Sequence, residues 1–138
     1  MKVVKDVNGN VVKFTINRKT WLRGNPNTSV MRNQHGSMCC LGHFARACGI
    51  PATTLVDKTT PGLMRIWGIK LPSQIEDALT ERKVSHYSGE TYIVNSDLAS
   101  EFIEANDKKD TPQAKRERKI KELFLDYPTG PIEVEFTN

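Results

Sequence analysis

The stretch VVKDVNGNVVKFTI, residues 3–16, sets the expected fold class of this chain. Its two halves are rich in β-branched residues and flank Asn8-Gly9, a pair that tolerates positive φ and suits a two-residue hairpin turn. In the second half, Val12, Phe14 and Ile16 alternate with polar residues, so one side of the ribbon should cover a core. We therefore expect an N-terminal β-hairpin with one buried face.

Working outward, the rest of the chain reads as helices followed by a last strand. Near the C-terminus, Ile132, Val134 and Phe136 alternate with glutamates, which predicts a half-buried strand. Four local signals in between each predict a helix: a run of apolar residues with helical spacing, a capping box, a serine cap and a Thr-Pro start. In that order, the expected helices cover 39–48, 73–79, 97–106 and 112–125. A second hairpin is expected over 84–94, broken at Ser88-Gly89. The sequence predicts a small mixed α+β domain, with the N-terminal β-hairpin and the C-terminal strand in an antiparallel sheet packed by about four helices.

Length and composition limit the class of protein. A chain of 138 residues with 38% hydrophobic content suits a single domain, residues 1–138. No segment approaches the roughly 18 consecutive apolar residues of a membrane span, and the start has no signal-peptide pattern, so we expect the protein to stay in the cytoplasm of the cell that makes it. The net charge of +4 favours anionic partners in general without selecting one.

Two motifs in the first third of the chain resemble a known group of proteins. The segment INRKTWLRG, residues 16–24, is followed by MCCLGHFARACGI, residues 38–50. Together they resemble small uncharacterised proteins of tailed phages and prophages, in which a Trp-containing segment ending in Arg-Gly precedes a Cys-Cys-Leu-Gly helix start. An Asn-Asp pair often follows much later, and Asn106-Asp107 matches it. The resemblance implies a viral origin and a host-cell location, but no reaction.

The cysteines offer three interpretations. Cys39 and Cys40 lie at an expected helix N-terminus, where the macrodipole favours a thiolate, and His86 could serve as the base of a cysteine hydrolase or transferase. Alternatively, Cys39, Cys40 and Cys48 are small buried residues in a reducing compartment. A zinc site with His35 and His43 is a third interpretation, but the spacing fits no known finger, so we expect no metal and no other cofactor.

Two groups of basic residues suggest binding sites. Arg18, Arg23 and Arg32 precede the cysteine helix and could form an anion site with its N-terminal amides. Trp21 and His43 belong to the same region and complete the candidate binding set. On the expected helix 112–125, three further cations, Lys115, Arg118 and Lys119, share a face that could meet phosphates or be an ordinary solvated face.

We expect a phage-encoded accessory protein that acts by binding a host protein or a defence-derived nucleotide signal, in host takeover or anti-defence. One alternative is the cysteine-dependent hydrolase or transferase that uses Cys39 or Cys40 with His86. The other is a nucleic-acid-binding protein that uses the basic helix. The sequence carries no established catalytic motif, which favours binding over catalysis.

Overall fold

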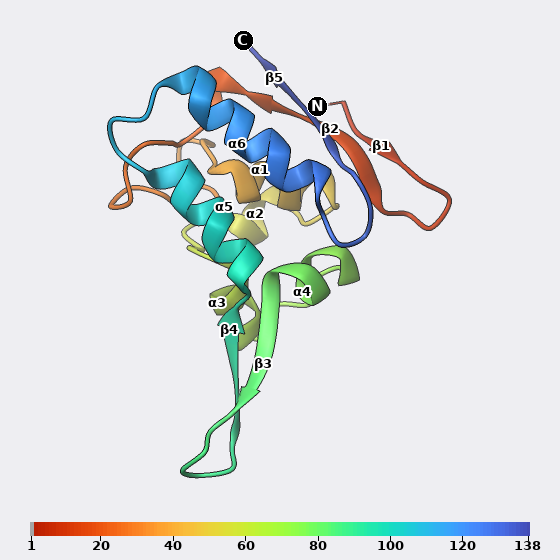
Figure 1. Ribbon diagram of the computed structural model, residues 1–138, viewed down its shortest axis with the longest axis vertical. Coiled ribbons are helices and arrows are strands. Elements are labelled where there is room, and N and C mark those ends of the chain that lie inside the picture. The colour runs from red at the N-terminus through yellow and green to blue at the C-terminus, as the bar shows by residue number, and fades with distance from the viewer. Residues whose placement is uncertain (1) are drawn as a thin grey trace.

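The computed structural model describes residues 2–138 and has the expected α+β class (Figure 1). Its elements form a three-stranded sheet, a separate two-stranded ribbon and six α-helices. A 3₁₀ turn covers Arg18–Thr20. The strands are β1 (Val4–Lys5), β2 (Val11–Asn17), β3 (Thr80–Val84), β4 (Thr91–Asn95) and β5 (Glu133–Thr137). The helices are α1 (Cys40–Ala47), α2 (Ala52–Leu55), α3 (Pro61–Ile66), α4 (Ser73–Leu79), α5 (Asp97–Asp107) and α6 (Gln113–Leu125).

The main sheet has the strand order β1-β2-β5. β1 and β2 are antiparallel, as expected for the N-terminal hairpin. β5 pairs with β2 in parallel, with Phe14 opposite Val134 and Ile16 opposite Phe136, so the expectation of an antiparallel sheet is wrong for this strand. The physical reason is that nearly the whole chain connects the two strands, and a long connection through helices allows the parallel direction that a tight turn forbids.

The N-terminal turn is longer than a two-residue hairpin. The backbone N–H of Asp6 donates to the carbonyl of Asn10, and the Asp6 carboxylate accepts from the N–H groups of Asn8 and Asn10. Gly9 has the positive φ that the turn requires, at 81°. The aspartate organises a wider loop, which leaves β1 only two residues long.

The core lies between the main sheet and three helices. Phe14 of β2, Phe44 of α1, Phe102 of α5 and Phe124 of α6 are all fully buried. Their rings contact one another edge-on or tilted, with centroids 5.1 Å apart for Phe14 and Phe124 and 4.4 Å apart for Phe102 and Phe124. These aromatic contacts join elements from both ends and the middle of the chain.

Helix starts follow the local signals to within a few residues. The Ser96 hydroxyl accepts from the N–H of Ala99, which confirms the expected cap of α5. α6 begins at Gln113, directly after Pro112. At α4, Ser73 is already inside the helix and caps nothing, so the capping box is wrong. α1 starts at Cys40, one residue after the expected start, and Ser37 does not cap it but belongs to the preceding turn, in which its N–H donates to the Asn33 side chain.

A close backbone contact fixes the position of α1. A Cβ added at Gly42 would lie 1.8 Å from the carbonyl oxygen of Met31 and 2.9 Å from the Cβ of Met38. Only glycine therefore lets α1 approach the segment that precedes it. In residues 2–138, no helix combines the length and apolar character needed to cross a membrane.

Candidate functional site

Asn106, near the end of α5, joins three segments that are distant in the sequence. Its Oδ1 accepts hydrogen bonds from the indole Nε1–H of Trp21, at 2.8 Å, and from the backbone N–H of Cys40, at 3.0 Å. Its Nδ2 donates to the carbonyl of Leu22 and to the carboxylate of Asp107. The side chain is almost completely buried. The Trp-Leu-Arg-Gly segment, the Cys-Cys-Leu-Gly start and Asn106-Asp107 therefore meet at one polar junction.

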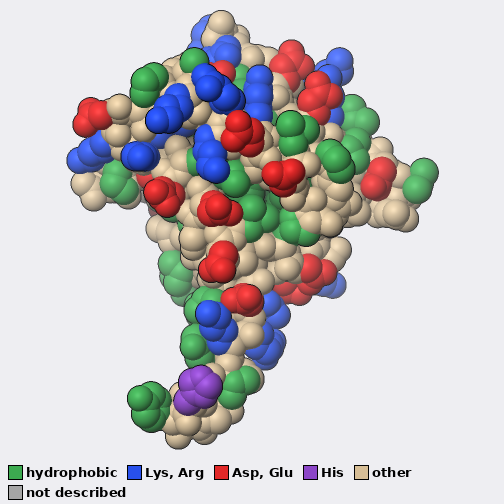
Figure 2. Space-filling view, in the orientation of Figure 1, with side chains coloured by type: hydrophobic (Ala, Val, Ile, Leu, Met, Phe, Trp, Pro, Cys, Tyr) green, Lys and Arg blue, Asp and Glu red, His purple; other side chains and the backbone are tan. Residues whose placement is uncertain are grey.

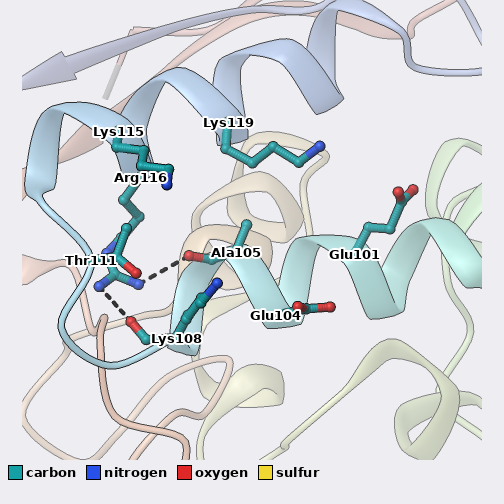
Figure 3. A pocket seen from close by; sticks show the side chains of 8 residues that line it. All are labelled: Glu101, Glu104, Ala105, Lys108, Thr111, Lys115, Arg116 and Lys119. Carbon is teal, nitrogen blue, oxygen red and sulfur yellow. Dashed lines mark hydrogen bonds between the residues drawn. The ribbon is translucent and has the colours of Figure 1, made fainter.

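Arg116 of α6 holds the end of α5 at this junction. Its guanidinium donates to the carbonyls of Ala105 and Lys108, at 3.0 and 2.7 Å (Figure 3), and to the carbonyl of Asn106 at 2.8 Å. These are the carbonyls that a helix C-terminus leaves without partners. Gly24 donates its N–H to the carbonyl of Asn106. The sequence did not indicate this role of Arg116, because an arginine within a run of basic residues is usually a solvated surface residue.

Arg18 and Arg23, two of the expected binding residues, have internal partners. Arg18 makes two hydrogen bonds to the carboxylate of Glu117, at 2.9 and 2.8 Å, and thereby lowers the pKa of that carboxyl group. Arg23 donates to the carbonyls of Arg18 and Trp21 and to Gln113, and its guanidinium lies 4.6 Å from the Trp21 ring centroid. The structure thus brings these residues together, but around intramolecular bonds.

Arg32 and His43, the other two expected binding residues, lie close enough for the Arg32 charge to act on the His43 imidazole. The Arg32 guanidinium approaches the sulfur of Met38 at 3.9 Å. His43 is only 3% exposed, and its Nε2 has no hydrogen-bond partner in the described residues. Burial lowers the pKa of His43 to about 4, a hydrogen bond with the backbone of Thr20 opposes the shift, and the nearby Arg32 charge adds to it. His43 is therefore a neutral, enclosed imidazole.

Burial also controls the cysteines. Cys39 and Cys40 are buried, and this raises the pKa of Cys39 to about 11 and that of Cys40 well above its ordinary value. Burial likewise raises the pKa of the half-buried Cys48 to about 12. The helix N-terminus does not offset the desolvation, and the Asp107 charge adds to the rise at both Cys39 and Cys40. The arrangement favours thiols over thiolates.

His86, the expected base, lies far from these thiols. It is in the turn that joins β3 and β4, at the free end of the ribbon, whereas Cys39 and Cys40 are in the body of the molecule at the start of α1 (Figure 1). The structure therefore does not place the His86 imidazole beside either cysteine. Nor do the described residues contain a group of three or more His, Cys, Asp or Glu side chains arranged to hold a metal ion.

A small cavity of about 200 Å³ opens beside the start of α1. Cys39, Cys40 and Leu41 line it together with Asp107, and two threonines, Thr59 and Thr60, lie across from them. The carboxylate of Asp107 on the wall disfavours an anionic ligand, although the helix N-terminus alone would favour one. This cavity is therefore poorly suited to a phosphate group.

A larger groove, of about 360 Å³, separates α5 from α6 (Figure 3). Lys115 and Lys119 of α6 line one wall, and Glu101 and Glu104 of α5 line the other. Arg118, the third expected nucleic-acid residue, does not line the groove. Lysines and arginines gather over this face, but carboxylates are interspersed with them (Figure 2). The opposite wall thus weakens the attraction of this groove for phosphates.

The ribbon formed by β3 and β4 projects from the body of the molecule (Figure 1). We call residues 80–95 the arm. The sequence predicts a hairpin in this region, but the expected bounds of 84–94 miss most of β3, which starts at Thr80 directly after α4. Sequence reasoning also assigned the hairpin no function beyond His86. Tyr87 at its tip is fully exposed, Val84 is 58% exposed and Tyr92 is about half exposed. Figure 2 shows hydrophobic and histidine side chains at the end of the arm.

The end of α3, beside the root of the arm, is also apolar and exposed. Ile66 is half exposed, and Trp67 is 61% exposed with the ammonium of Lys58 5.4 Å from its ring centroid. α3 packs against β4 at this end of the molecule (Figure 1). The signal that could have found this surface is the group of aromatic residues in 67–92 that fits no buried periodicity.

No protein-family model, curated protein or solved structure matches this chain.

Proposed function

We propose that this chain is a phage-encoded accessory protein that binds a host protein. The binding surface consists of the arm and the exposed end of α3. The phage origin rests on the resemblance of residues 16–24 and 38–50 to small phage proteins. The observation that carries the docking surface is the exposure of Tyr87 and Trp67 at one end of the molecule. Tyrosine and tryptophan are enriched among residues that dominate protein–protein affinity.

The root of the arm is rigid, which favours recognition. Arg65 of α3 donates to the Thr80 hydroxyl at 3.0 Å and pairs with Glu76 of α4 at 3.3 Å. The Asn95 side chain accepts from the N–H of Gly62 at 2.7 Å, a contact that leaves no room for a Cβ on Gly62. A preorganised protrusion loses less conformational entropy when it binds.

The tip of the arm is organised as well. The Ser85 hydroxyl accepts from the N–H groups of Tyr87 and Ser88, and the Ser88 hydroxyl accepts from the N–H of Glu90. These side-chain bonds hold the turn that presents Tyr87 to solvent. The core of the protein makes no use of this side chain, so Tyr87 is free to contact a partner.

The charges of the arm favour a protein partner over a nucleic acid. Arg82 and Lys83 are offset by Glu81 and Glu90, so the arm has no net charge with His86 neutral. Phosphate binding depends on an excess of cations. A nucleotide signal is supported less well, because Arg18 and Arg23 already have internal partners. The cysteine enzyme is also less well supported, since both thiols are buried and His86 lies elsewhere.

A quantitative affinity capture from host lysate tests the proposal. The wild-type chain is compared with Tyr87→Ser and Trp67→Ser and with the matched control Leu125→Ser, which changes an exposed apolar residue of α6. All variants should keep the wild-type melting temperature. We expect one host protein to be recovered by the wild type and the control and lost with both arm-end variants.

The opposite pattern contradicts the proposal. If the host protein is retained by Tyr87→Ser and Trp67→Ser but lost with Leu125→Ser, the docking surface lies on α6. If a nucleic acid is the species recovered, at physiological salt and in a manner that depends on Lys115 and Lys119, the basic helix is the functional face.

A further inference from the structure

The hydrogen-bond pattern of the arm determines which backbone groups face outward. The N–H of Ser96 donates to the carbonyl of Leu79 at the root, and the N–H of Ser85 donates to the carbonyl of Glu90 at the tip. Between these bonds, the register pairs Lys83 with Tyr92 and Val84 with Thr91. Paired and unpaired positions alternate along an antiparallel ladder. In β3, the backbone groups of Arg82 and Val84 therefore point away from β4.

This outer edge of β3 is open. At the root, the Thr80 N–H is occupied by the carbonyl of Glu76. Farther out, Glu81, Arg82, Lys83 and Val84 are all exposed, and in residues 2–138 the N–H groups of Arg82 and Val84 donate to nothing outside the ribbon. No helix or strand runs alongside β3 on this side in Figure 1. The other strand is more protected, since Ile93, Val94 and Asn95 of β4 are partly buried and Asn95 accepts from the N–H of Gly62 in α3.

We infer that the outer edge of β3 accepts an extended segment of the partner protein as an added third strand. This inference rests on the proposed function and specifies how the partner docks. An unpaired strand edge offers a row of donors and acceptors that an extended peptide can complete.

The side chains of β3 define the chemistry of the added strand. Glu81 is paired with Lys83 at 3.8 Å. The Arg82 guanidinium donates to the Thr91 hydroxyl at 3.4 Å but has no carboxylate partner in the described residues. Arg82 and Val84 lie on the same face of the ribbon, two residues apart. The segment that fits therefore carries an Asp or Glu opposite Arg82 and an apolar side chain two positions away, opposite Val84.

A second copy of this chain is a poorer occupant. An antiparallel pair of β3 strands centred on Arg82 would place the two Arg82 guanidinium groups directly opposite each other. Like charges in that position are destabilising. Charged side chains on an edge strand are also a common means of preventing self-association. The charge pattern of β3 thus favours a different protein with a carboxylate at this position.

A display library of random linear 12-residue peptides, selected against the full chain, tests the inference. We expect enrichment of sequences with an acidic residue two positions from an apolar residue. A synthetic peptide with the enriched sequence, at saturation, should slow amide hydrogen exchange at Arg82 and Val84 by about tenfold or more, as a new backbone hydrogen bond requires. The amides of Thr91 and Ile93, on the opposite edge, should not change.

Proline variants provide the matched control. Val84→Pro should still fold, because proline is tolerated at edge positions whose N–H does not donate within the sheet. It removes one outward N–H from β3, and the loss of that hydrogen bond should weaken peptide binding by about tenfold. Ile93→Pro removes an outward N–H from the β4 edge, keeps the Thr91 hydroxyl that Arg82 contacts, and should bind like the wild type. Val84→Thr keeps the N–H and should retain most of the affinity.

Several results would overturn the inference. One is that Val84→Pro binds the peptide as tightly as the wild type, and another is that the peptide slows amide exchange only at Thr91 and Ile93. The others are that the selected peptides lack acidic residues, or that the free chain forms a dimer through β3. If Tyr87→Ser and Trp67→Ser abolish capture of the host protein while Val84→Pro leaves it intact, the proposed function stands and the added strand is wrong.

Discussion

The indole of Trp21 and the side-chain amide of Asn106 are joined by a buried hydrogen bond of 2.8 Å, although 85 residues separate them. The same Asn106 oxygen accepts from the backbone N–H of Cys40. One asparagine thereby connects the segment after β2, the start of α1 and the end of α5. In this way it resembles a core residue, although its side chain is polar.

Replacing Asn106 with Ala should therefore destabilise the fold strongly. The change leaves the Trp21 N–H, the Cys40 N–H and the Leu22 carbonyl without partners, and each buried unsatisfied group costs about 1–3 kcal/mol. We expect the free energy of unfolding to fall by about 3–5 kcal/mol in urea denaturation. Asn27→Ala, at an exposed loop position, should change it by less than about 0.5 kcal/mol. A loss below about 1 kcal/mol at Asn106 would mean that water replaces the amide.

Gly42→Ala should destabilise the protein, although alanine normally stabilises a helix by about 1 kcal/mol relative to glycine. The new Cβ would meet the Met31 carbonyl oxygen at 1.8 Å, so the backbone of α1 has to shift. We expect a loss of more than about 2 kcal/mol, in the range of overpacked cores. The reverse exchange in the same helix, Ala47→Gly, should cost about 1–2 kcal/mol. Equal stability of Gly42→Ala and the wild type would show that α1 is not held against Met31.

The thiols of Cys39 and Cys40 should react slowly. Because burial raises both pKa values, little thiolate forms near neutral pH. Native protein treated with a disulfide reagent should label these residues at least about 100-fold more slowly than free cysteine, and labelling in denaturant should reach all three cysteines. Rapid labelling of Cys39 or Cys40 in the native state would revive the nucleophile hypothesis.

His43 should make the stability depend on pH below about 6.5. Its folded pKa is about 4, so between pH 6.5 and 4 the unfolded chain binds a proton that the folded chain does not. The free energy of unfolding therefore falls as the pH drops through this window and is unaffected by His43 above it. The full loss amounts to about 3 kcal/mol.

The variant His43→Leu isolates this contribution. It removes the titrating group and the Nε2 atom that lacks a partner, so its stability at pH 7.5 should equal or exceed that of the wild type. Between pH 7 and 5 its free energy of unfolding should decline less than that of the wild type. His35→Leu, at an exposed turn position, serves as the control and should keep the wild-type decline. Parallel curves for His43→Leu and the wild type would refute the assignment to His43.

The candidate site was only partly accessible to sequence reasoning. The aromatic residues in 84–94 are evident in the sequence, but the sequence does not show whether they are exposed or form a buried strand face. The arginines that precede α1 suggested an anion site, because arginine in a loop often binds a ligand. In the structure, Glu117 from α6 is the partner of Arg18, and 99 positions separate the two. Nothing near Arg18 in the sequence indicates that carboxylate.

The sequence by itself determined the α+β class, the β2 and β5 strand patterns, the presence of a second hairpin before Asn95 and the start of α5 at the Ser96 cap. These features depend on alternation and on hydrogen bonds between residues a few positions apart, so the local sequence contains them. Only the tertiary structure decided that β5 joins β2 in parallel, that Asn106 and Arg116 hold the junction, and that the arm projects into solvent. Each of these depends on which distant segments bury each other's polar and apolar groups, and that is a property of the whole packed chain.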